Sequence, residues 1–348
     1  MSAAREFAKA GFDDWLLLEQ WNDRLGGRLF TRKMGAGSDT CPADGCPVEI
    51  GARYIQGIQR NPVYDLLKNG IGFRMHQVNY NKVLVFDENG EEEKKPPWHE
   101  WDSAFVCAEE LGNELNQIPN NNEEKDGRSL LASDQCGWNN DTPVKDAIEW
   151  FDMEFEYGRS PEQVGAYAFP EYTYMDFRGF DYYGADERGL EKIITHFQKD
   201  LEGSGEIRTG DPGTVVEIAT LVDEKECHGE GLDANCVKIS IADGTILYAQ
   251  WAISTIPFGV IKHNVESGNA APLFRDATDD WKDVVKKFIM GGYHSTYLRF
   301  SKKFWPNTEF ILSSRTDDSD LNKPVIGFKP HDTVSRMNCA ELSKLHTL

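Results

Sequence analysis

The chain contains Trp15-Leu-Leu-Leu-Glu19 followed by Asp23-Arg-Leu-Gly-Gly-Arg28, close behind a segment rich in Ala, Glu, Lys and Arg. That first segment, from Ser2 to Ala10, predicts a short helix, because Gly11 follows where a glycine often ends one. The run of leucines predicts a buried strand with an acidic tip, since buried parallel strands are apolar on both faces. Helix, strand and glycine turn together indicate the second half of a βαβ unit.

An acidic strand tip followed by a glycine turn is typical of a dinucleotide site. Glu19 at the tip can accept hydrogen bonds from ribose hydroxyls, while phosphates lie at a helix N-terminus. Gly26 and Gly27 let the backbone approach a ligand closely, and Arg28 can pair with a phosphate. We therefore assign these four residues to cofactor binding.

The chain has 348 residues, and one domain takes roughly 150, so the length predicts about two domains. Its 40% hydrophobic and 27% charged residues are typical of globular proteins and exclude a disordered or collagenous chain. The 37 basic and 58 acidic residues give a formal charge of −21, which disfavours nucleic acid and favours cations, including cationic small molecules. No apolar run approaches the roughly 20 residues of a membrane span, and we expect neither a span nor a targeting segment.

Seven cysteines leave at least one thiol unpaired by any internal disulfide. Cys41 and Cys46 lie in a short loop with two prolines, which suits a local disulfide, and Asn140-Asp-Thr142 is a glycosylation sequon. Both features favour an oxidising, secretory compartment, with cytoplasm or peroxisome as the alternatives. The spacing of Cys227 and Cys236 does not suit a zinc knuckle, and we expect no metal site.

Hydrophobic patterns divide the chain into alternating α/β and sheet-rich parts. Strands are predicted at Thr214 to Ile218, Val237 to Ile241 and Thr245 to Leu247, after a helix that begins near Gly189. A hairpin is predicted around the turn Asp87-Glu-Asn-Gly90. The predicted arrangement is a dinucleotide-binding domain in residues 1–75 and 185–285, interrupted by a substrate domain in residues 76–184 and 286–348.

Five ordered stretches resemble one known family. Glu19 through Arg28 is the first, and Val48-Glu-Ile-Gly-Ala-Arg-Tyr-Ile-Gln-Gly57 is the second. The others are Ala185 through Gly189, Val215-Val-Glu-Ile218, and Trp251 through Ile261 with Phe304-Trp-Pro306 beyond it. In this order they are similar to the flavin-dependent amine oxidases, closest to the polyamine oxidase branch, and the resemblance extends from Ser2 to about Lys329.

The resemblance implies a fold, a cofactor and a reaction. The fold is α/β, with an incomplete Rossmann-like FAD-binding domain interleaved with an α+β substrate domain on a mostly antiparallel sheet. FAD accepts a hydride from the carbon next to an amine nitrogen, the imine is hydrolysed, and dioxygen reoxidises the flavin with release of hydrogen peroxide. Beside Glu19, Gly26, Gly27 and Arg28, the implied cofactor-binding residues are Gly51, Ala52, Arg53, Tyr54 and Val215.

The chain also departs from the family pattern. The family's Gly-x-Gly-x-x-Gly loop would precede Met1, and its C-terminal segment does not occur before Leu348, so we expect a flavin domain truncated at both ends. Gly35-Ala-Gly-Ser38 cannot replace the loop, because no strand precedes it. The acidic residue of several polyamine oxidases falls on Gln56, and a lysine that commonly holds a water falls on Ser295, beside His294. We therefore name no catalytic residue.

The preferred function is oxidation of an amine, in particular a polyamine, with FAD and dioxygen, as in polyamine catabolism. Two alternatives are a non-catalytic or truncated relative, in which the flavin site is incomplete, and another flavoprotein oxidase of the same fold such as an L-amino-acid oxidase. Fold analogy does not choose among them.

We predict that Glu19→Ala weakens FAD binding, because the substitution removes the ribose acceptor at the strand tip. A titration of the purified chain with FAD measures this affinity. An unchanged affinity contradicts the assignment of Glu19.

Overall fold

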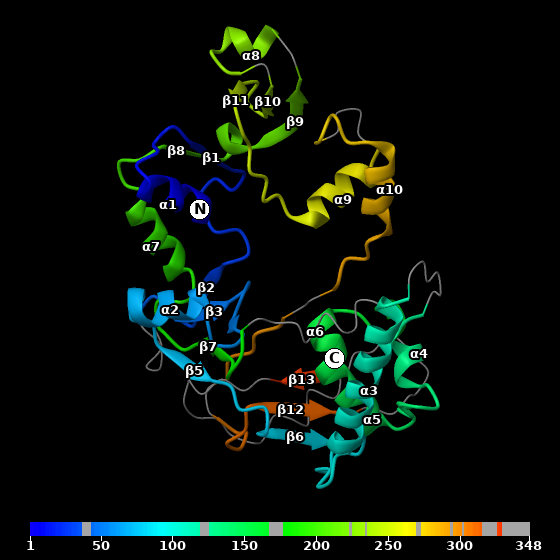
Figure 1. Ribbon diagram of the computed structural model, residues 1–348. Coiled ribbons are helices and arrows are strands. Elements are labelled where there is room, and N and C mark those ends of the chain that lie inside the picture. The colour runs from blue at the N-terminus through cyan, green and yellow to red at the C-terminus, as the bar shows by residue number, and fades with distance from the viewer. Residues whose placement is uncertain are drawn as a thin grey trace. The chain divides into compact units, whose positions relative to one another are not determined.

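The computed structural model describes residues 1–36, 43–118, 125–166, 177–222, 225–233, 235–268, 273–292, 295–300 and 303–314, and the backbone of 326–328. The chain forms two compact units, whose elements are labelled in Figure 1. Unit 1 comprises Met1–Phe30 and Glu191–Met290, and unit 2 comprises Thr31–Leu190 and the chain from Gly291 onward.

Unit 1 contains helices and strands from both of its chain segments. They are α1 (Ser2–Lys9), β1 (Leu16–Glu19), α7 (Lys192–Asp200), β8 (Glu206–Thr209), the 3-10 turn η5 (Asp211–Gly213), β9 (Val215–Leu221), α8 (Lys225–Gly229), β10 (Cys236–Ile241), β11 (Ile246–Ala249), α9 (Phe258–Glu266) and α10 (Asp279–Lys287).

Strands β1 and β8 pair in parallel, with Leu16 opposite Glu206 and Glu19 opposite Thr209. Helix α1 packs with α7, and the Arg5 guanidinium lies 2.5 Å from the Asp200 carboxylate. A parallel pair needs a long connection, and here some 185 residues of chain separate the two strands. The predicted helix, the predicted strand and its acidic tip are therefore confirmed, whereas the Rossmann-like topology stays a prediction.

Strands β9, β10 and β11 form an antiparallel meander, and they confirm the three strands predicted in this part of the chain. The connection between β10 and β11 contains Gly244 with a φ of +89°, which only glycine adopts readily. A disulfide joins Cys227 of α8 to Cys236 of β10. Residues 251–257 contain no regular structure, and the Trp251 side chain is 84% exposed.

Unit 2 holds the longest described helix. Its elements are β2 (Thr31–Met34), β3 (Cys46–Glu49), β4 (Tyr54–Ile55), α2 (Pro62–Asp65), the π-helix η1 (Leu66–Ile71), β5 (Met75–Gln77), β6 (Val83–Phe86), α3 (Trp98–Asn116), α4 (Gly127–Leu131), α5 (Pro143–Glu149), the π-helix η2 (Trp150–Glu154), α6 (Phe155–Tyr157), the 3-10 turn η3 (Pro161–Gln163), β7 (Tyr182–Gly184), β12 (Phe310–Ser313) and β13 (Ile326–Phe328).

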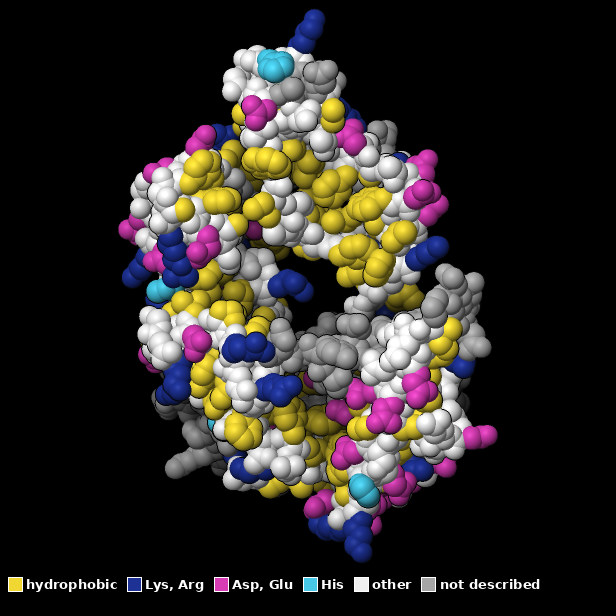
Figure 2. Space-filling model, viewed as in Figure 1, with side chains coloured by type: hydrophobic (Ala, Val, Ile, Leu, Met, Phe, Trp, Pro, Cys, Tyr) yellow, Lys and Arg dark blue, Asp and Glu magenta, His cyan; other side chains and the backbone are white. Residues whose placement is uncertain are grey.

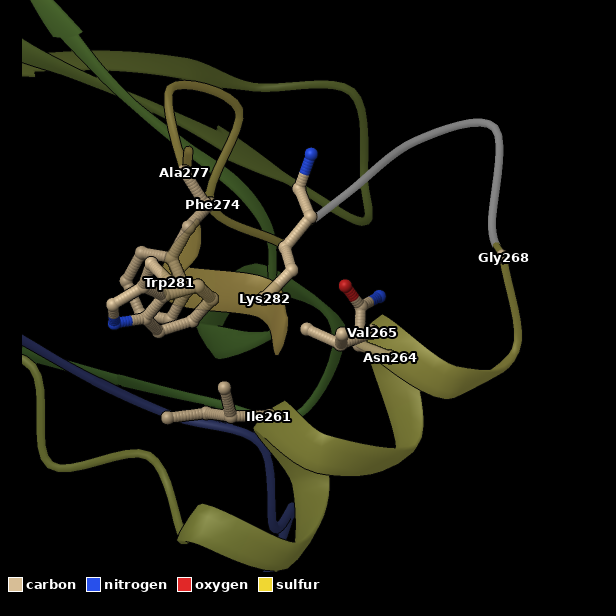
Figure 3. Close-up of a pocket in the computed structure, with 8 residues that line it drawn as sticks. All are labelled: Ile261, Asn264, Val265, Gly268, Phe274, Ala277, Trp281 and Lys282. Carbon is tan, nitrogen blue, oxygen red and sulfur yellow. The ribbon is translucent and has the colours of Figure 1, made fainter. Parts of the chain in front are cut away.

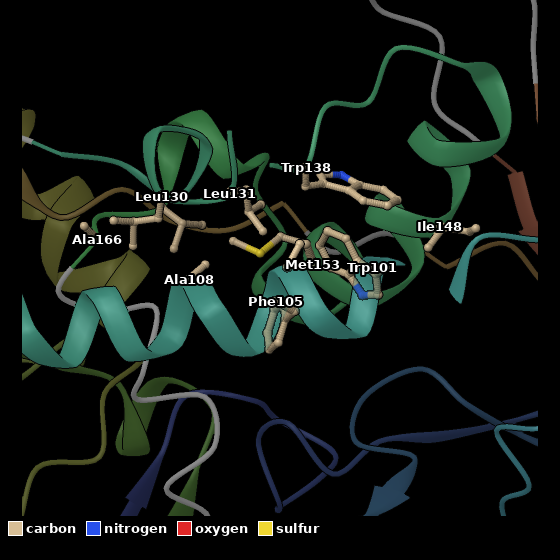
Figure 4. Packing of buried hydrophobic residues seen from close by; sticks show 11 residues of the cluster. Trp101, Phe105, Ala108, Leu130, Leu131, Trp138, Ile148, Met153 and Ala166 are labelled. Atoms are coloured by element: carbon tan, nitrogen blue, oxygen red, sulfur yellow. The ribbon is translucent and has the colours of Figure 1, made fainter. Parts of the chain in front are cut away.

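The main core of unit 2 lies between α3, α4 and the chain that follows them (Figure 4). The Trp101 and Trp138 rings meet edge to face with centroids 5.0 Å apart, and both side chains are buried. A disulfide between Cys107 and Cys136 fastens α3 to this chain. Burial of two indoles contributes several kcal/mol at about 25 cal/mol per Å².

The hairpin predicted around Asp87–Gly90 forms as a turn closed by a single antiparallel bridge between Phe86 and Glu92, and the Glu93 amide donates to the Val85 carbonyl at 2.8 Å. Directly beyond this turn the described residues contain no second strand. Strand β6 instead pairs in parallel with β12, from Val83 opposite Phe310 onward, and β12 pairs antiparallel with β13. Pairing of β6 with apolar β12 buries Val85 of β6 and Leu312 of β12 in the same core cluster. The acidic stretch after the turn has no apolar side chains with which to do this.

The division into units does not test the predicted domain limits, which stay a prediction. Unit 2 begins at Thr31, and the chain returns to unit 1 at Glu191 and leaves it again after Met290. Unit 2 begins as early as Thr31 for a local reason. Strand β2, which starts there, pairs with β3, and Lys33 of β2 donates from Nζ to the Glu187 carbonyl at 2.6 Å.

Candidate functional site

The carboxyl end of β1 places Glu19 beside the beginning of α1. The Glu19 carboxylate accepts a hydrogen bond from the Trp21 amide at 3.0 Å. Burial lowers the pKa of the Met1 amino group, and the negative charge of Glu19 partly offsets this change. The acid and the first turn of the helix therefore lie close together, which is the arrangement that a ribose and its phosphates require.

The turn η5 crosses the ends of β1 and β8. A Cβ on Gly213 would lie 2.3 Å from the carbonyl oxygens of both Glu19 and Arg208, so only glycine permits this approach. Val215 follows two residues later, at the first pairing of β9 and opposite Ile241. Glu19 and Val215, which the sequence assigned to one cofactor, thus belong to neighbouring parts of unit 1.

The glycine turn of unit 1 is closed by the Leu29 amide, which donates to the Gly26 carbonyl at 3.0 Å. Gly26 and Gly27 have φ angles of +109° and +55°, so both positions favour glycine. A Cβ on Gly26 would also lie 2.7 Å from the Ile194 side chain. Arg28 is exposed, and among the described residues its guanidinium makes no hydrogen bond or ion pair.

The sequence analysis missed Arg24, which lies inside this turn. Its guanidinium Nη2 donates to the carbonyls of Gly27 at 2.6 Å and Leu29 at 2.9 Å. The guanidinium carbon also lies 4.2 Å from the centre of the Phe30 ring. A signal was available, since an arginine four residues before a second arginine in a glycine turn can bind the turn's own carbonyls.

Unit 2 brings Arg53 together with the segment after Gly291. The Arg53 guanidinium donates to the Ser295 hydroxyl and lies 5.7 Å from the Tyr297 ring centre. The Tyr297 hydroxyl in turn donates to the Glu49 carbonyl. Where the resemblance expects a lysine, the chain therefore has a serine whose hydroxyl binds a guanidinium, so a positive charge lies next to that position. His294 lies outside the described residues.

The other predicted residues of unit 2 lie between β3 and the first residue of β4. Gly51 and Ala52 lie in an irregular segment between β3 and β4, and Tyr54 pairs with Tyr183 of β7. The carbonyl of Gln56 accepts a hydrogen bond from the buried Asn61 amide at 3.2 Å. The nine predicted residues thus divide into five in unit 1 and four in unit 2.

A group of buried carboxylates in unit 2 was also missed. Burial raises the pKa of Glu154 and of Glu156 from 4.5 to about 7, and like charges add to the effect: Asp152 and Asp181 act on Glu156. The Tyr80 hydroxyl donates to the Asp181 carboxylate at 2.8 Å. The signal was the run Trp150-Phe-Asp-Met-Glu-Phe-Glu-Tyr157, where acids alternate with large apolar residues and cannot all face water. Perturbed pKa values of this kind are common at functional sites.

A pocket of about 190 Å³ lies between α9 and α10 in unit 1 (Figure 3). Ile261 and Val265 project from α9 toward the rings of Phe274 and Trp281, which meet edge to face at 5.8 Å. None of the predicted cofactor-binding residues lines it. Figure 2 shows apolar side chains gathered over the same two helices, and acidic side chains over the part of unit 2 that holds α3 to α5.

Within the described ranges, no group of three or more His, Cys, Asp or Glu side chains is arranged to hold a metal ion. The helices that the structure describes include none with the length and apolar character needed to cross a bilayer.

The chain belongs to the family of flavin containing amine oxidoreductases, whose family model matches residues 1–333. It is 23% identical to polyamine oxidase 6 of Oryza sativa subsp. japonica, over 91% of this chain and 62% of that protein. It is 23% identical to polyamine oxidase 1 of Zea mays, over 90% of this chain and 61% of that protein. The chain thus spans about three fifths of the length of these curated relatives.

A solved structure, the PF1083 protein from Pyrococcus furiosus, superposes with a TM-score of 0.52 at 15% identity, over 90% of this chain and 68% of that one. This likeness concerns the fold alone, which has mixed helix and sheet content. The family-model match over residues 1–333 confirms the predicted family, and the cofactor of that family is FAD.

The residues of unit 1 fit part of that cofactor. Glu19 beside the start of α1 suits the ribose, and the exposed Arg28 guanidinium suits a diphosphate. All nine assignments to cofactor binding, Glu19, Gly26, Gly27, Arg28, Gly51, Ala52, Arg53, Tyr54 and Val215, stay predictions.

We expect Gly26→Ala to lower the free energy of unfolding by more than about 1 kcal/mol, because the new Cβ meets Ile194 in addition to the unfavourable positive φ. Gly27→Ala is the matched control, since its Cβ would have nothing within 4 Å and introduces the φ penalty alone. Urea unfolding measures both. Equal losses in the two variants would show that contact with Ile194 contributes nothing.

The raised pKa values predict a pH dependence of stability. In the folded chain Glu156 keeps its proton up to about pH 7, whereas in the unfolded chain it loses it near 4.5. The contribution of Glu156 to the free energy of unfolding is therefore fully present below pH 4.5 and is lost as the pH rises to about 7. The slope of this loss is at most about 1.4 kcal/mol per pH unit. We expect Glu156→Gln to remove this part of the dependence.

The measurement is urea unfolding from pH 4.5 to 8, compared as a difference between wild type and variant. Glu114→Gln, at an exposed position of α3, is the control and leaves the curve unchanged. A Glu156→Gln curve parallel to that of wild type would contradict the buried, protonated state of Glu156.

Proposed function

We propose that the protein oxidises an amine, in particular a polyamine, with FAD as the hydride acceptor. Membership of the flavin containing amine oxidoreductase family is the observation that carries the proposal, and similarity to polyamine oxidases supports the choice of substrate. The formal charge of −21 supports the same choice, since it favours the approach of polycations.

When bound, FAD accepts a hydride from the carbon next to the amine nitrogen, the resulting imine is hydrolysed, and dioxygen is reduced to hydrogen peroxide. The chain's own residues bind the cofactor and the substrate. The Glu19 carboxylate accepts hydrogen bonds from the ribose, and the Arg28 guanidinium pairs with the diphosphate.

The buried carboxylates give unit 2 groups that suit an amine. With a pKa of about 7, Glu156 exchanges a proton at neutral pH, so its carboxylate oxygen can attract a cationic amine and take a proton from it. Glu154 has a similar pKa, but it lies among other charges, those of Asp146, Glu149 and Glu162, and residues two apart in a helix point to opposite sides. We therefore assign the binding of an amine nitrogen to Glu156, in place of Gln56, which has no carboxylate.

We also propose that the protein acts in an oxidising compartment. Two disulfides, Cys107–Cys136 and Cys227–Cys236, lie in the described residues, and Cys46 is disulfide-bonded as well. Its predicted partner, Cys41, lies outside the described residues. Disulfides of this number are rare in reducing compartments.

A visible spectrum tests the function. The purified chain is incubated with FAD and desalted, and spermidine is then added without air. We expect retained flavin bands that bleach with spermidine and return with air, together with hydrogen peroxide. Glu156→Gln should raise the KM for spermidine, because a carboxylate is lost, and Glu114→Gln should not.

Retained flavin bands that no amine bleaches would contradict the proposed oxidation and favour the non-catalytic alternative. Bleaching by an L-amino acid in place of spermidine would favour an L-amino-acid oxidase instead.

A further inference from the structure

The turn from Gly26 to Leu29 has one face that presents backbone carbonyls and another that presents a backbone N–H. On one face, the carbonyls of Gly27 and Leu29 accept hydrogen bonds from the same nitrogen, Nη2 of Arg24, at 2.6 and 2.9 Å. Arg24 is held in this position by aromatic rings, with its guanidinium carbon 4.2 Å from the centre of Phe30 and 5.5 Å from that of Trp21. The side chain therefore covers one face of the turn and occupies its carbonyls.

Peptide geometry determines what the other face presents. The chain contains no cis peptide bond among its described residues, and in a trans peptide the N–H points opposite to the preceding carbonyl. Because the Gly27 carbonyl points toward Arg24, the N–H of Arg28 points away from it. Among the residues that the structure describes, this N–H has no acceptor, and the Arg28 side chain is exposed.

A backbone N–H and a guanidinium from the same residue, both without a partner in the described chain, make an anion site in a glycine turn. If the Gly27 carbonyl pointed into this site, its oxygen would repel a phosphate oxygen. Gly27 has no side chain to restrict rotation of the Gly27–Arg28 peptide, so the peptide could turn its carbonyl toward the site. The hydrogen bond from Arg24 to the Gly27 carbonyl prevents this rotation.

We propose that Arg24 is a positioning residue for the diphosphate of FAD: it holds the Gly27 and Leu29 carbonyls on one face and thereby directs the Arg28 N–H to the other. The inference rests on the proposed use of FAD. Arg24 itself does not touch the cofactor, and its effect passes through the orientation of one peptide.

The test compares ligands that do and do not carry a diphosphate. Affinities of FAD, ADP and adenosine are measured by titration for wild type, Arg24→Ala and Arg24→Lys. We expect Arg24→Ala to lower the affinity for FAD and for ADP at least tenfold, which is about 1.4 kcal/mol. The affinity for adenosine should stay within twofold of that of wild type. Arg24→Lys should lie between, because an ammonium lacks the planar fork of a guanidinium.

Arg208→Lys is the matched control, since Arg208 lies in the same unit and forms an ion pair with exposed Glu206. It should leave all three affinities unchanged. An equal loss of affinity for ADP and for adenosine in Arg24→Ala would overturn the proposal, because a merely structural role lowers both affinities. Affinities that do not change would overturn it as well.

The outcome separates this inference from the proposed function. A wild-type chain that binds neither FAD nor ADP overturns both. A chain that binds FAD in an Arg24-dependent manner but is not bleached by amines supports the role of Arg24 and overturns the oxidation.

Discussion

Glu49 holds together the two chain segments of unit 2. Its carboxylate accepts a hydrogen bond from the Thr31 hydroxyl and another from the Leu190 amide, each at 2.7 Å, and its carbonyl accepts one from Tyr297. Thr31 and Leu190 are the first and last residues of one segment, and Tyr297 belongs to the next. Gly189 fits only because it lacks a Cβ, which would lie 2.3 Å from Thr31. One acidic residue thus fixes the chain where it enters and leaves the unit, directly before Gly51–Tyr54.

Burial of charge has two different consequences in this protein. Burial raises the pKa of Glu149, but Arg128 binds its carboxylate and Trp138 donates to it at 2.9 Å, and these hydrogen bonds partly offset the rise, so the group is satisfied and serves the core. Glu154 and Glu156 lie two residues apart further along the same helical stretch, and burial together with neighbouring like charges raises the pKa of each to about 7. The same residue type is structural in one place and titrates near neutral pH in the other.

The glycine turn of unit 1 shows how a ligand site can depend on a residue that does not touch the ligand. Arg24 and Arg28 have the same side chain and lie four residues apart, yet one is bound to the turn's carbonyls and the other faces solvent. Their roles differ because backbone geometry places one inside the turn and the other outside. Family membership implies FAD, and we propose that this turn presents donors to its diphosphate.

The sequence by itself determined the elements whose causes are local, namely α1, β1 with Glu19 at its tip, the β9–β11 meander and the glycine turn, as well as the family. These depend on capping, periodicity and turn residues within a few positions. Only the tertiary structure decided the pairing of β6 with β12, the partners of Cys107 and Cys227, and the contact of Arg53 with Ser295. It also decided which acids are buried. Each of these depends on packing between side chains distant in sequence or between whole elements, where burial of apolar surface selects the partner and no local pattern records it.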